Sequence, residues 1–390
     1  MKVLLLNTDD FTGGAAIACR RLLRALNISG LFEAKMLVQT AKSAEEGIIQ
    51  LSNSWFSKKV AWCRFVLERL FFLFFEKSKE VRFLFNPGRF GINIADNPFI
   101  KSTDIIHLHW INFGFLSIDS IGELIKSGKP IVWTLHDMWA FTGGCHHSGN
   151  CENYQNQCGN CNQFLKNPSQ NDLSNQIWEQ KIKVFEKANL TVVTCSDWLN
   201  GRAQKSSLFA QNQIVTIPNP INTALFKPIE KSLAQNKLQL NTSKKYILFA
   251  AMNIHAEGKG YQYFSEAIQI LFDQYHDLLQ NTELLIFGKA NVSDFSNLPL
   301  KVNFLGQLSA IDLIINAYNA SSVFVIPSLE ENLPNTIMEA MACGTPVVGF
   351  EVGGIPEMIV HKETGYLAQY KSAKDLANGI FHVLFEANYE

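Results

Sequence analysis

The stretch PSLEENLPNTIMEAMACGTPVVGFEVGGIPEMI, residues 327–359, decides the fold of this chain. It follows the apolar run Val323–Ile326, which predicts a buried strand, so the stretch begins as a loop at the carboxyl end of that strand. Asn335 or Thr336 can cap the helix that follows, and Gly344 ends it. The first turn of such a helix offers unpaired N–H groups and a partial positive charge, which together suit a phosphate.

Two carboxylates flank the start of this helix. Glu331 lies in the loop, and Glu339 lies inside the helix, roughly 5–6 Å further along its axis. A carboxylate accepts two hydrogen bonds at once and therefore suits a vicinal diol, as sugars and ribose offer. Both glutamates could instead be ordinary surface charges. A second glycine pair, Gly353-Gly354 before Pro356, could open another phosphate-compatible helix start and favours the ligand-binding interpretation.

The rest of the chain repeats the alternation of strands and helices. Its 390 residues favour two domains, and three prolines within Ile217–Pro228 predict a linker between them. We therefore predict an α/β protein with two Rossmann-like, doubly wound parallel sheets that face a cleft, with ligands beyond the carboxyl ends of the strands. The predicted strands are Lys2–Leu6, Glu33–Val38, Ile105–Leu108, Ile131–Leu135, Leu190–Cys195, Gln213–Ile217, Tyr246–Ala250, Leu284–Phe287, Val302–Leu305, Val323–Ile326 and Val347–Phe350.

These features resemble the family-4 retaining glycosyltransferases, which have the two-domain GT-B fold. Glu331 and Glu339 match the E-x7-E motif of that family. The resemblance implies that the first glutamate contacts the donor sugar at the reacting centre and that the second binds the nucleotide ribose. Lys259, followed by a glycine, resembles the lysine that binds the donor diphosphate. Gly13 and Gly14 resemble the glycine loop that approaches the donor phosphates.

The resemblance covers almost the whole chain and implies its division into domains. Residues 1–220 would form the acceptor-side domain, with a Cys-rich loop at 141–165 and an aromatic, basic helix at 55–75. Residues 221–375 would bind the nucleotide-sugar. Residues 376–390 would form a helix that packs back on the first domain.

One departure from the family concerns the donor diphosphate. Many members pair the lysine with an arginine several residues earlier, but Ala250–Lys259, AAMNIHAEGK, contains no arginine. Lys259 would then share the diphosphate charge only with helix N–H groups and the neutral Asn253. We expect looser donor binding, or reliance on another cation.

The predicted strand that ends in TLHDMW brings polar side chains to its carboxyl end, which faces the cleft in this fold class. The family places a histidine there, near the reacting sugar or the acceptor. We therefore expect His136 to be catalytic, and Asp137 and Trp139 to lie on the acceptor side. The alternative is a structural histidine whose hydrogen bonds are all made within its own loop. His107 and His109 alternate along another strand and are expected in the core or at the rim of the cleft.

The sequence offers phosphate sites and a histidine but no convincing nucleophile. In the family, retaining chemistry is usually described as substitution on one face of the sugar, in which the leaving diphosphate helps to deprotonate the acceptor. The protein then positions both substrates and stabilises the negative charge of the leaving group. Because no Asp-x-Asp motif appears, we expect no cofactor for catalysis.

Four cysteines crowd into one short stretch, at Cys145, Cys151, Cys158 and Cys161. The final Cys-x-x-Cys has the spacing of a structural zinc site, and four thiolates would close a tetrahedral site that braces a long loop over the cleft. His146 or His147 could replace one thiolate. Disulfides, an iron–sulfur cluster and four unconnected thiols are the alternatives. A subset of bacterial polysaccharide glycosyltransferases resembles this chain in the whole histidine-to-cysteine block.

The segment Trp55–Phe75 mixes Phe, Trp and Leu with lysines and arginines. It predicts either an interfacial helix on an anionic membrane or an inserted helix that packs on the first domain. No run reaches the ~18 apolar residues of a membrane span, and MKVLLLN is too short for a signal-peptide core. We expect a cytoplasmic protein, peripheral to the inner face of the membrane if the segment binds lipid.

The sequence therefore predicts a hexosyltransferase-type, retaining glycosyltransferase of polysaccharide biosynthesis. Its partners would be a UDP- or GDP-sugar and a saccharide or lipid-linked acceptor. The alternatives are another GT-B enzyme, either a nucleotide-sugar epimerase or a sugar-phosphate synthase, and a zinc-braced binding protein. A net charge of −1 and the absence of a basic stripe count against a nucleic-acid partner, and the absence of a G-x-G-x-x-G fingerprint counts against a dinucleotide oxidoreductase.

Overall fold

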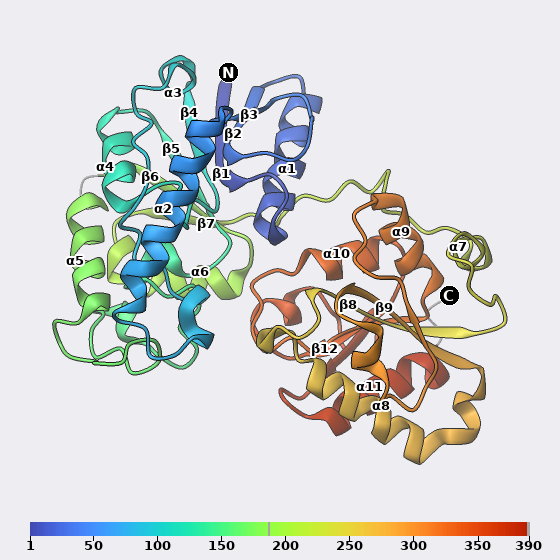
Figure 1. Ribbon diagram of the computed structural model, residues 1–390. Coiled ribbons are helices and arrows are strands. Elements are labelled where there is room, and N and C mark those ends of the chain that lie inside the picture. The colour runs from blue at the N-terminus through green and yellow to red at the C-terminus, as the bar shows by residue number, and fades with distance from the viewer. Residues whose placement is uncertain (186–187, 388–390) are drawn as a thin grey trace. The chain divides into compact units, whose positions relative to one another are not determined.

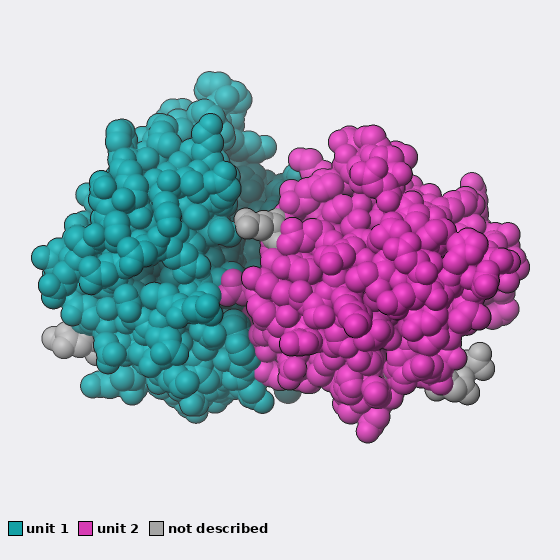
Figure 2. Space-filling view, turned by 90° about the horizontal axis from the view of Figure 1, so that it is seen from below, with its two compact units in different colours: residues 1–220 teal, residues 221–390 magenta. Residues whose placement is uncertain are grey.

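The computed structural model describes residues 1–185 and 188–387 of the chain. The chain divides into two compact units, Met1–Pro220 and Ile221–Glu390, which Figure 2 distinguishes by colour. Each unit is built on its own parallel sheet, so each is described by itself. No helix or strand lies between Thr216 and Glu230, the region of the predicted linker.

The first unit contains a seven-stranded parallel sheet in the order β3-β2-β1-β4-β5-β6-β7 (Figure 1). The chain first runs outward from β1 to β3 and then continues on the other side of β1, so the strand order reverses between β1 and β4. The strands are β1 (Lys2–Asp9), β2 (Glu33–Thr40), β3 (Ile48–Gln50), β4 (Ile105–Leu108), β5 (Ile131–Leu135), β6 (Leu190–Thr194) and β7 (Gln213–Thr216). The sequence predicted all of these strands except β3.

Helices cover both faces of this sheet because both faces of its strands are apolar. Alternate residues of β1 belong to different hydrophobic clusters: Leu4 and Leu6 to one, Val3 and Leu5 to the other. The helices are α1 (Gly13–Ile28), α2 (Trp55–Leu73), α3 (Pro98–Ser102), α4 (Ile118–Lys126), α5 (Leu173–Phe185) and α6 (Asp197–Gln204), with single turns η1 (Glu80–Phe83), η2 (Trp139–Phe141), η3 (Asn153–Gln155) and η4 (Ser207–Phe209).

The second unit contains a six-stranded parallel sheet in the order β10-β9-β8-β11-β12-β13. Here the strand order reverses between β8 and β11. The strands are β8 (Lys245–Asn253), β9 (Thr282–Lys289), β10 (Val302–Phe304), β11 (Val323–Ile326), β12 (Val347–Phe350) and β13 (Gly365–Ala368). The sequence predicted all of these strands except β13.

Helices also cover both faces of the second sheet, with α8 and α11 on one face and α9 and α10 on the other (Figure 1). Its helices are α7 (Lys231–Lys237), α8 (Tyr261–Tyr275), α9 (Ile311–Ala320), α10 (Asn335–Ala342) and α11 (Ala373–Phe381), with shorter turns η5 (Glu257–Lys259), η6 (His276–Asn281), η7 (Val292–Phe295), η8 (Ile355–Glu357) and η9 (His382–Glu386). Two doubly wound parallel sheets confirm the predicted fold class.

The helix α11 packs within the second unit, on α8 and on β13. The expected return of residues 376–390 to the first domain stays a prediction. The apolar face of α11 explains this position, because Leu376, Ala377 and Ile380 join the core of the second unit. Residues 388–390 of the predicted segment lie outside the described residues.

In the described part of the chain, no helix combines the length and the apolar character that crossing a membrane requires.

Candidate active site

Three loops meet at the point where the strand order of the second sheet reverses. They follow β8, β11 and β12, and ligands of doubly wound sheets bind at this position. Leu329 N–H donates to Gly258 O over 2.9 Å, and Gly354 N–H donates to Glu331 O over 3.2 Å. The loop after β11 is therefore fastened to the loops on both of its sides.

Two glycines permit this close approach of the loops. Gly260 has φ +66° and Gly353 has φ +60°, a region that favours glycine. A Cβ atom at Gly260 would lie 1.9 Å from Pro327 O, and one at Gly353 would lie 1.8 Å from Glu331 O. No other residue type fits either position without moving the neighbouring loop.

This arrangement brings the predicted diphosphate lysine and the first glutamate of the motif into contact. Lys259 Nζ lies 2.5 Å from Glu331 Oε1. The lysine side chain is 39% exposed and the carboxylate is 14% exposed. An ion pair this close to solvent can exchange partners when an anion arrives, because water and a ligand both reach the ammonium group.

The second glutamate of the motif lies deeper. Glu339 is 7% exposed, and Tyr318 Oη donates to its Oε2 over 3.0 Å. The helix that carries it, α10, begins at Asn335 and follows Pro334 without a side-chain cap. The prediction that Asn335 or Thr336 caps this helix is therefore wrong. Both residues lie in its first turn, since Pro334 already supplies the extended conformation of the cap position.

In the first unit, Gly13 and Gly14 begin α1 directly after β1. Gly13 has φ +79° and opens a 16-residue helix. Asp9 Oδ1 accepts the N–H groups of Phe11 over 2.9 Å and Thr12 over 2.6 Å, which holds the turn before the helix. The glycine loop thus lies at the point where the first sheet reverses its strand order.

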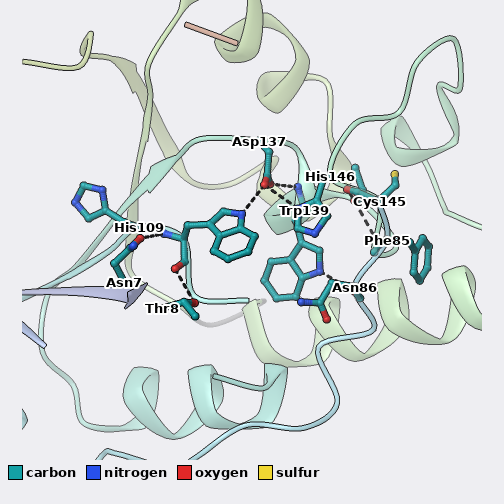
Figure 3. A network of polar contacts seen from close by, with 12 residues as sticks. Asn7, Thr8, Phe85, Asn86, His109, Asp137, Trp139, Cys145 and His146 are labelled. Carbon is teal, nitrogen blue, oxygen red and sulfur yellow. Dashed lines mark hydrogen bonds and ion pairs between the residues drawn. The ribbon is translucent and has the colours of Figure 1, made fainter. Parts of the chain in front are cut away.

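A network of polar contacts lies beyond the carboxyl ends of β4 and β5 (Figure 3). The carboxylate of Asp137 accepts the indole N–H of Trp110 over 2.9 Å, lies 2.7 Å from His146 Nδ1, and accepts the backbone N–H of Trp139 over 2.8 Å. Burial alone would raise the pKa of Asp137. Attraction and hydrogen bonding from His146 outweigh it and lower this pKa to about 2.

His136 belongs to a chain of stacked histidines. His136 Nε2 lies 3.0 Å from His109 Nδ1, and the rings of His109 and His107 stack with centroids 4.5 Å apart. Burial lowers the pKa of His136 to about 4 and that of His107 to about 3, and it holds the pKa of His109 well below its usual value. All three imidazoles are therefore neutral near pH 7, so His136 can accept a proton or donate a neutral N–H.

Trp139 lies in the core of the first unit. Its side chain is 2% exposed, its indole N–H donates to Asn86 O over 2.8 Å, and its backbone carbonyl accepts from the buried ammonium of Lys181. Burial lowers the pKa of Lys181 to about 7. Direct contact between the Trp139 indole and an acceptor would require this packing to open, whereas Asp137 and His136 lie closer to the surface.

A small cavity of about 10 Å³ is lined by residues of this network, including His109, Asn112, His136 and Asp137. That volume suits about one water molecule. The cavity is too small for a monosaccharide, so any saccharide bound here would lie outside it.

The sequence did not single out several members of the network. Asn7 accepts the backbone N–H of Trp110 over 2.8 Å, Thr8 Oγ1 donates to Trp110 O over 3.0 Å, and Lys181 donates to Trp139 O. Each is an ordinary residue type in its own segment, and only the sheet brings these segments together. His146 was noticed as a substitute zinc ligand, but its structural partner is Asp137.

The four cysteines of the Cys-rich loop lie near one another. Burial raises the pKa of Cys145 well above its usual value, and the other three thiols raise it further. The backbone N–H of Gly143 donates to Cys158 Sγ over 3.1 Å. Burial raises the pKa of Cys161 to about 11, and hydrogen bonds from backbone N–H groups offset part of this rise. Nevertheless, no three His, Cys, Asp or Glu side chains among residues 1–185 and 188–387 are arranged to hold a metal ion.

Comparison with known proteins places the second unit in a family. Residues 244–385 match the protein family described as "Glycosyl transferases group 1". The putative colanic acid biosynthesis glycosyl transferase WcaC of Escherichia coli strain K12 is 27% identical over 280 residues, which cover 68% of this chain and 65% of that protein. The UDP-Gal:alpha-D-GlcNAc-diphosphoundecaprenol alpha-1,3-galactosyltransferase of Escherichia coli is 26% identical over 180 residues, which cover 44% of this chain and 45% of that protein.

Such matches span about half to two thirds of the length of the curated relatives. Among solved structures, Anabaena Alr3699/HepE in complex with UDP-glucose has a TM-score of 0.60 at 16% identity, covering 99% of this chain and 90% of that chain. This likeness confirms the GT-B fold for the chain as a whole.

Proposed function

Because residues 244–385 form a domain of the group 1 glycosyltransferase family, we propose that this protein is a retaining glycosyltransferase. It moves a sugar from a nucleotide-sugar to a saccharide or lipid-linked saccharide during polysaccharide assembly. The observation that carries this proposal is the ion pair between Lys259 and Glu331, which stands where the second sheet reverses its strand order and beside the start of α10.

The donor site follows from these contacts. A diphosphate takes Lys259 Nζ as its cation and the N–H groups of the first turn of α10, at Asn335 and Thr336, as its donors. Glu331 is thereby released from Lys259 and accepts hydrogen bonds from hydroxyls of the donor sugar. Glu339, held by Tyr318, accepts hydrogen bonds from the ribose diol.

The first unit supplies the acceptor side. His136 is neutral at the carboxyl end of β5 and accepts or donates a hydrogen bond at the reacting centre. Asp137 orients the loop that follows through Trp110 and His146, and Trp139 acts as a positioning residue from the core. Gly13 and Gly14 present N–H groups at the start of α1 to the donor phosphates. The leaving diphosphate takes the proton of the acceptor hydroxyl, so these residues position substrates and stabilise charge.

The names of two relatives support the substrate classes. One is named for colanic acid biosynthesis, and another for a UDP-galactose donor and a diphosphoundecaprenol-linked acceptor. A structural neighbour was solved with UDP-glucose. These names favour a UDP-sugar as the first donor to test and a lipid-linked saccharide as the first acceptor.

A screen of UDP- and GDP-sugars for thermal stabilisation of the full chain tests the proposal. The stabilising sugar is then incubated with saccharide acceptors, and NMR spectroscopy reports the anomeric configuration of the product. We expect transfer with the configuration of the donor retained, and activity that survives a chelator as long as the cysteine cluster keeps its metal. Release of an epimerised sugar or of a sugar phosphate would favour the alternative GT-B enzymes. Absence of stabilisation by every nucleotide and nucleotide-sugar would overturn the donor site.

We also propose that Cys145, Cys151, Cys158 and Cys161 hold a structural zinc ion. Four thiols with backbone N–H groups directed at Cys158 and Cys161 form a donor set that zinc prefers. The buried ammonium of Lys181 would offset part of the negative charge of four thiolates. Since no three ligands converge among the described residues, zinc binding would tighten the loop.

A further inference from the structure

Helix α2 presents a largely apolar side to solvent, and the side that it packs on the protein includes charged as well as apolar residues. Glu68 is fully buried and Arg69 is 7% exposed, although both are charged. The opposite face, here called the α2 face, is formed mostly by exposed apolar side chains, among them Trp55, Phe56, Trp62, Leu67, Leu70 and Leu73. An ordinary surface helix has the reverse pattern. A contiguous apolar surface of this kind marks an interaction site.

Polar contacts fix the rotation of this helix. Glu68 accepts the backbone N–H groups of Gly88 over 2.6 Å and Phe90 over 2.8 Å. Arg69 donates to Phe85 O over 3.2 Å, and Arg64 Nε donates to Gly114 O over 3.0 Å. A turn of the helix that buried its apolar side would leave Glu68 and Arg69 without these partners, which is costly for buried charges.

The backbone of α2 also packs so closely on the rest of the first unit, at Gly114, that the helix cannot shift there. Gly114 has φ +89°, and a Cβ atom there would lie 2.7 Å from Phe65 N. These contacts hold α2 in this rotation, so the α2 face stays on the surface of the first unit.

The charges on the α2 face indicate which partner it fits. Lys58 and Lys59 are the only exposed charged residues between Trp55 and Leu73. Among the described residues, neither lysine has an acidic partner within ion-pair distance, and Lys59 Nζ lies 5.8 Å from the ring centroid of Trp55. Tryptophan and lysine side chains at one end of an apolar helix suit the headgroup level of an anionic bilayer.

We propose that α2 lies flat on an anionic lipid surface, with the α2 face in the boundary between headgroups and acyl chains and with Lys58 and Lys59 against lipid phosphates. A 19-residue helix offers about 28 Å of length in the plane of the membrane. Because its other side is docked on the first unit through Glu68, Arg69 and Arg64, the whole unit is carried to the surface. This surface function is independent of the proposed catalytic activity.

Co-sedimentation of the full chain with vesicles tests this inference. One set of vesicles contains phosphatidylcholine alone, and the other also contains phosphatidylglycerol. We expect binding to the anionic vesicles that weakens with salt, because exposed charges are screened. Lys58→Glu with Lys59→Glu should weaken it by at least about 5-fold for each lysine changed. Trp55→Ser with Phe56→Ser should abolish it, since serine cannot enter the acyl boundary.

Matched variants in the second unit serve as controls. Lys237→Glu with Lys374→Glu changes the net charge equally, and Leu278→Ser with Val292→Ser likewise removes two exposed apolar side chains. Both pairs should bind vesicles as the unaltered chain does. Circular dichroism checks that every variant is folded.

Three results would overturn the inference. The first is folded protein that stays in the supernatant with anionic vesicles at low salt. The second is equal binding by the α2 variants and their controls. The third is a dimer that only the α2 variants dissociate while vesicles capture nothing, which would make the α2 face a contact between two copies. None of these readouts depends on nucleotide-sugar turnover.

Discussion

Lys259 stands out at the scale of single residues because it is the cation that the sequence assigns to the donor diphosphate. The structure places it against Glu331, so the two side chains proposed for the donor site are in contact. No arginine lies in the preceding stretch Ala250–Gly258. In the proposed function, therefore, no arginine of that stretch shares the diphosphate charge with Lys259.

Lys259→Ala should weaken nucleotide-sugar binding by roughly 10- to 100-fold, which corresponds to one charge-assisted hydrogen bond. Calorimetric titration with the nucleotide product measures the affinity. Lys289→Ala, at the end of the neighbouring strand β9 and also exposed, is the matched control. Equal affinity of Lys259→Ala and the unaltered chain would remove Lys259 from the donor site.

Tyr318→Phe removes the hydroxyl that donates to Glu339 in the interior. We expect a loss of about 2 kcal/mol in the free energy of unfolding, because a buried carboxylate loses a partner. The KM for the donor should rise several-fold with little change in kcat.

Tyr246→Phe is the control for this substitution. Its hydroxyl also lies in the second unit but bonds only to the backbone of Asn241. It should cost comparable stability and leave the donor KM unchanged. A donor KM that moved equally in both variants would show that Tyr318 acts through stability alone.

At the scale of elements, the proposed donor site depends on how three loops are fastened together. The loop after β11 reaches its neighbours only because Gly260 and Gly353 leave room for its carbonyl groups. The position of Glu331 is thus set by a residue on another loop, more than twenty positions away in sequence.

Gly353→Ala should displace Glu331 and cost about 2 kcal/mol or more of stability, because the new methyl group collides with Glu331 O and the left-handed backbone disfavours alanine. Donor affinity should fall together with stability. Gly128→Ala, at φ +72° with no atom near its Cβ position, isolates the backbone strain from the collision. Chemical denaturation and nucleotide titration on both variants measure the two effects.

The Cys-rich loop yields a second prediction at this scale. Purified protein should contain about one zinc ion per chain, and a chelator should lower its Tm because the metal stabilises only the folded state. Cys158→Ser should lose the metal, whereas Cys19→Ser, which alters a buried thiol of the same unit outside the loop, should keep it. Metal-free protein of unchanged Tm would exclude the zinc site.

At the scale of the whole molecule, we expect the two units to respond to different variables. The first unit holds three neutral histidines with lowered pKa values, and the second unit carries the loops of the proposed donor site. Acid should therefore act mainly on the first unit, and a nucleotide mainly on the second.

Stability should fall as the pH drops below about 6.5. The pKa values of His136 and His107 are lowered to about 4 and 3 in the folded chain, so between these values and 6.5 the unfolded chain binds more protons. The stabilisation is complete above pH 6.5 and is lost toward pH 4. At pH 5.5 each histidine costs about 1 kcal/mol relative to pH 7.5. Denaturation at both pH values measures this loss.

His136→Asn should reduce the difference between the two pH values, because one titrating group is absent. Hydrogen exchange followed by mass spectrometry locates the effects along the full chain. Acid should increase exchange in β4 and β5, and a nucleotide should decrease it around Lys259 and α10. Equal responses of both units to both variables would contradict this division.

The sequence alone determined the alternation of buried strands and helices, and hence two doubly wound parallel sheets, because apolar runs are buried in the core. It also singled out Lys259, Glu331 and Glu339 as candidates for the donor site, and their roles stay predictions. It missed β3 and β13, since both are short strands at sheet edges with weak apolar signals. It placed the helix cap at Asn335 or Thr336, one or two positions late.

Only the tertiary structure decided which segments meet. It paired Lys259 with Glu331, gathered Trp110, His146 and Trp139 around Asp137, and turned the apolar side of α2 outward. These outcomes depend on contacts between residues that are far apart in the chain. Local sequence patterns do not predict these contacts, because packing between distant segments sets the order of strands in a sheet and the rotation of a helix.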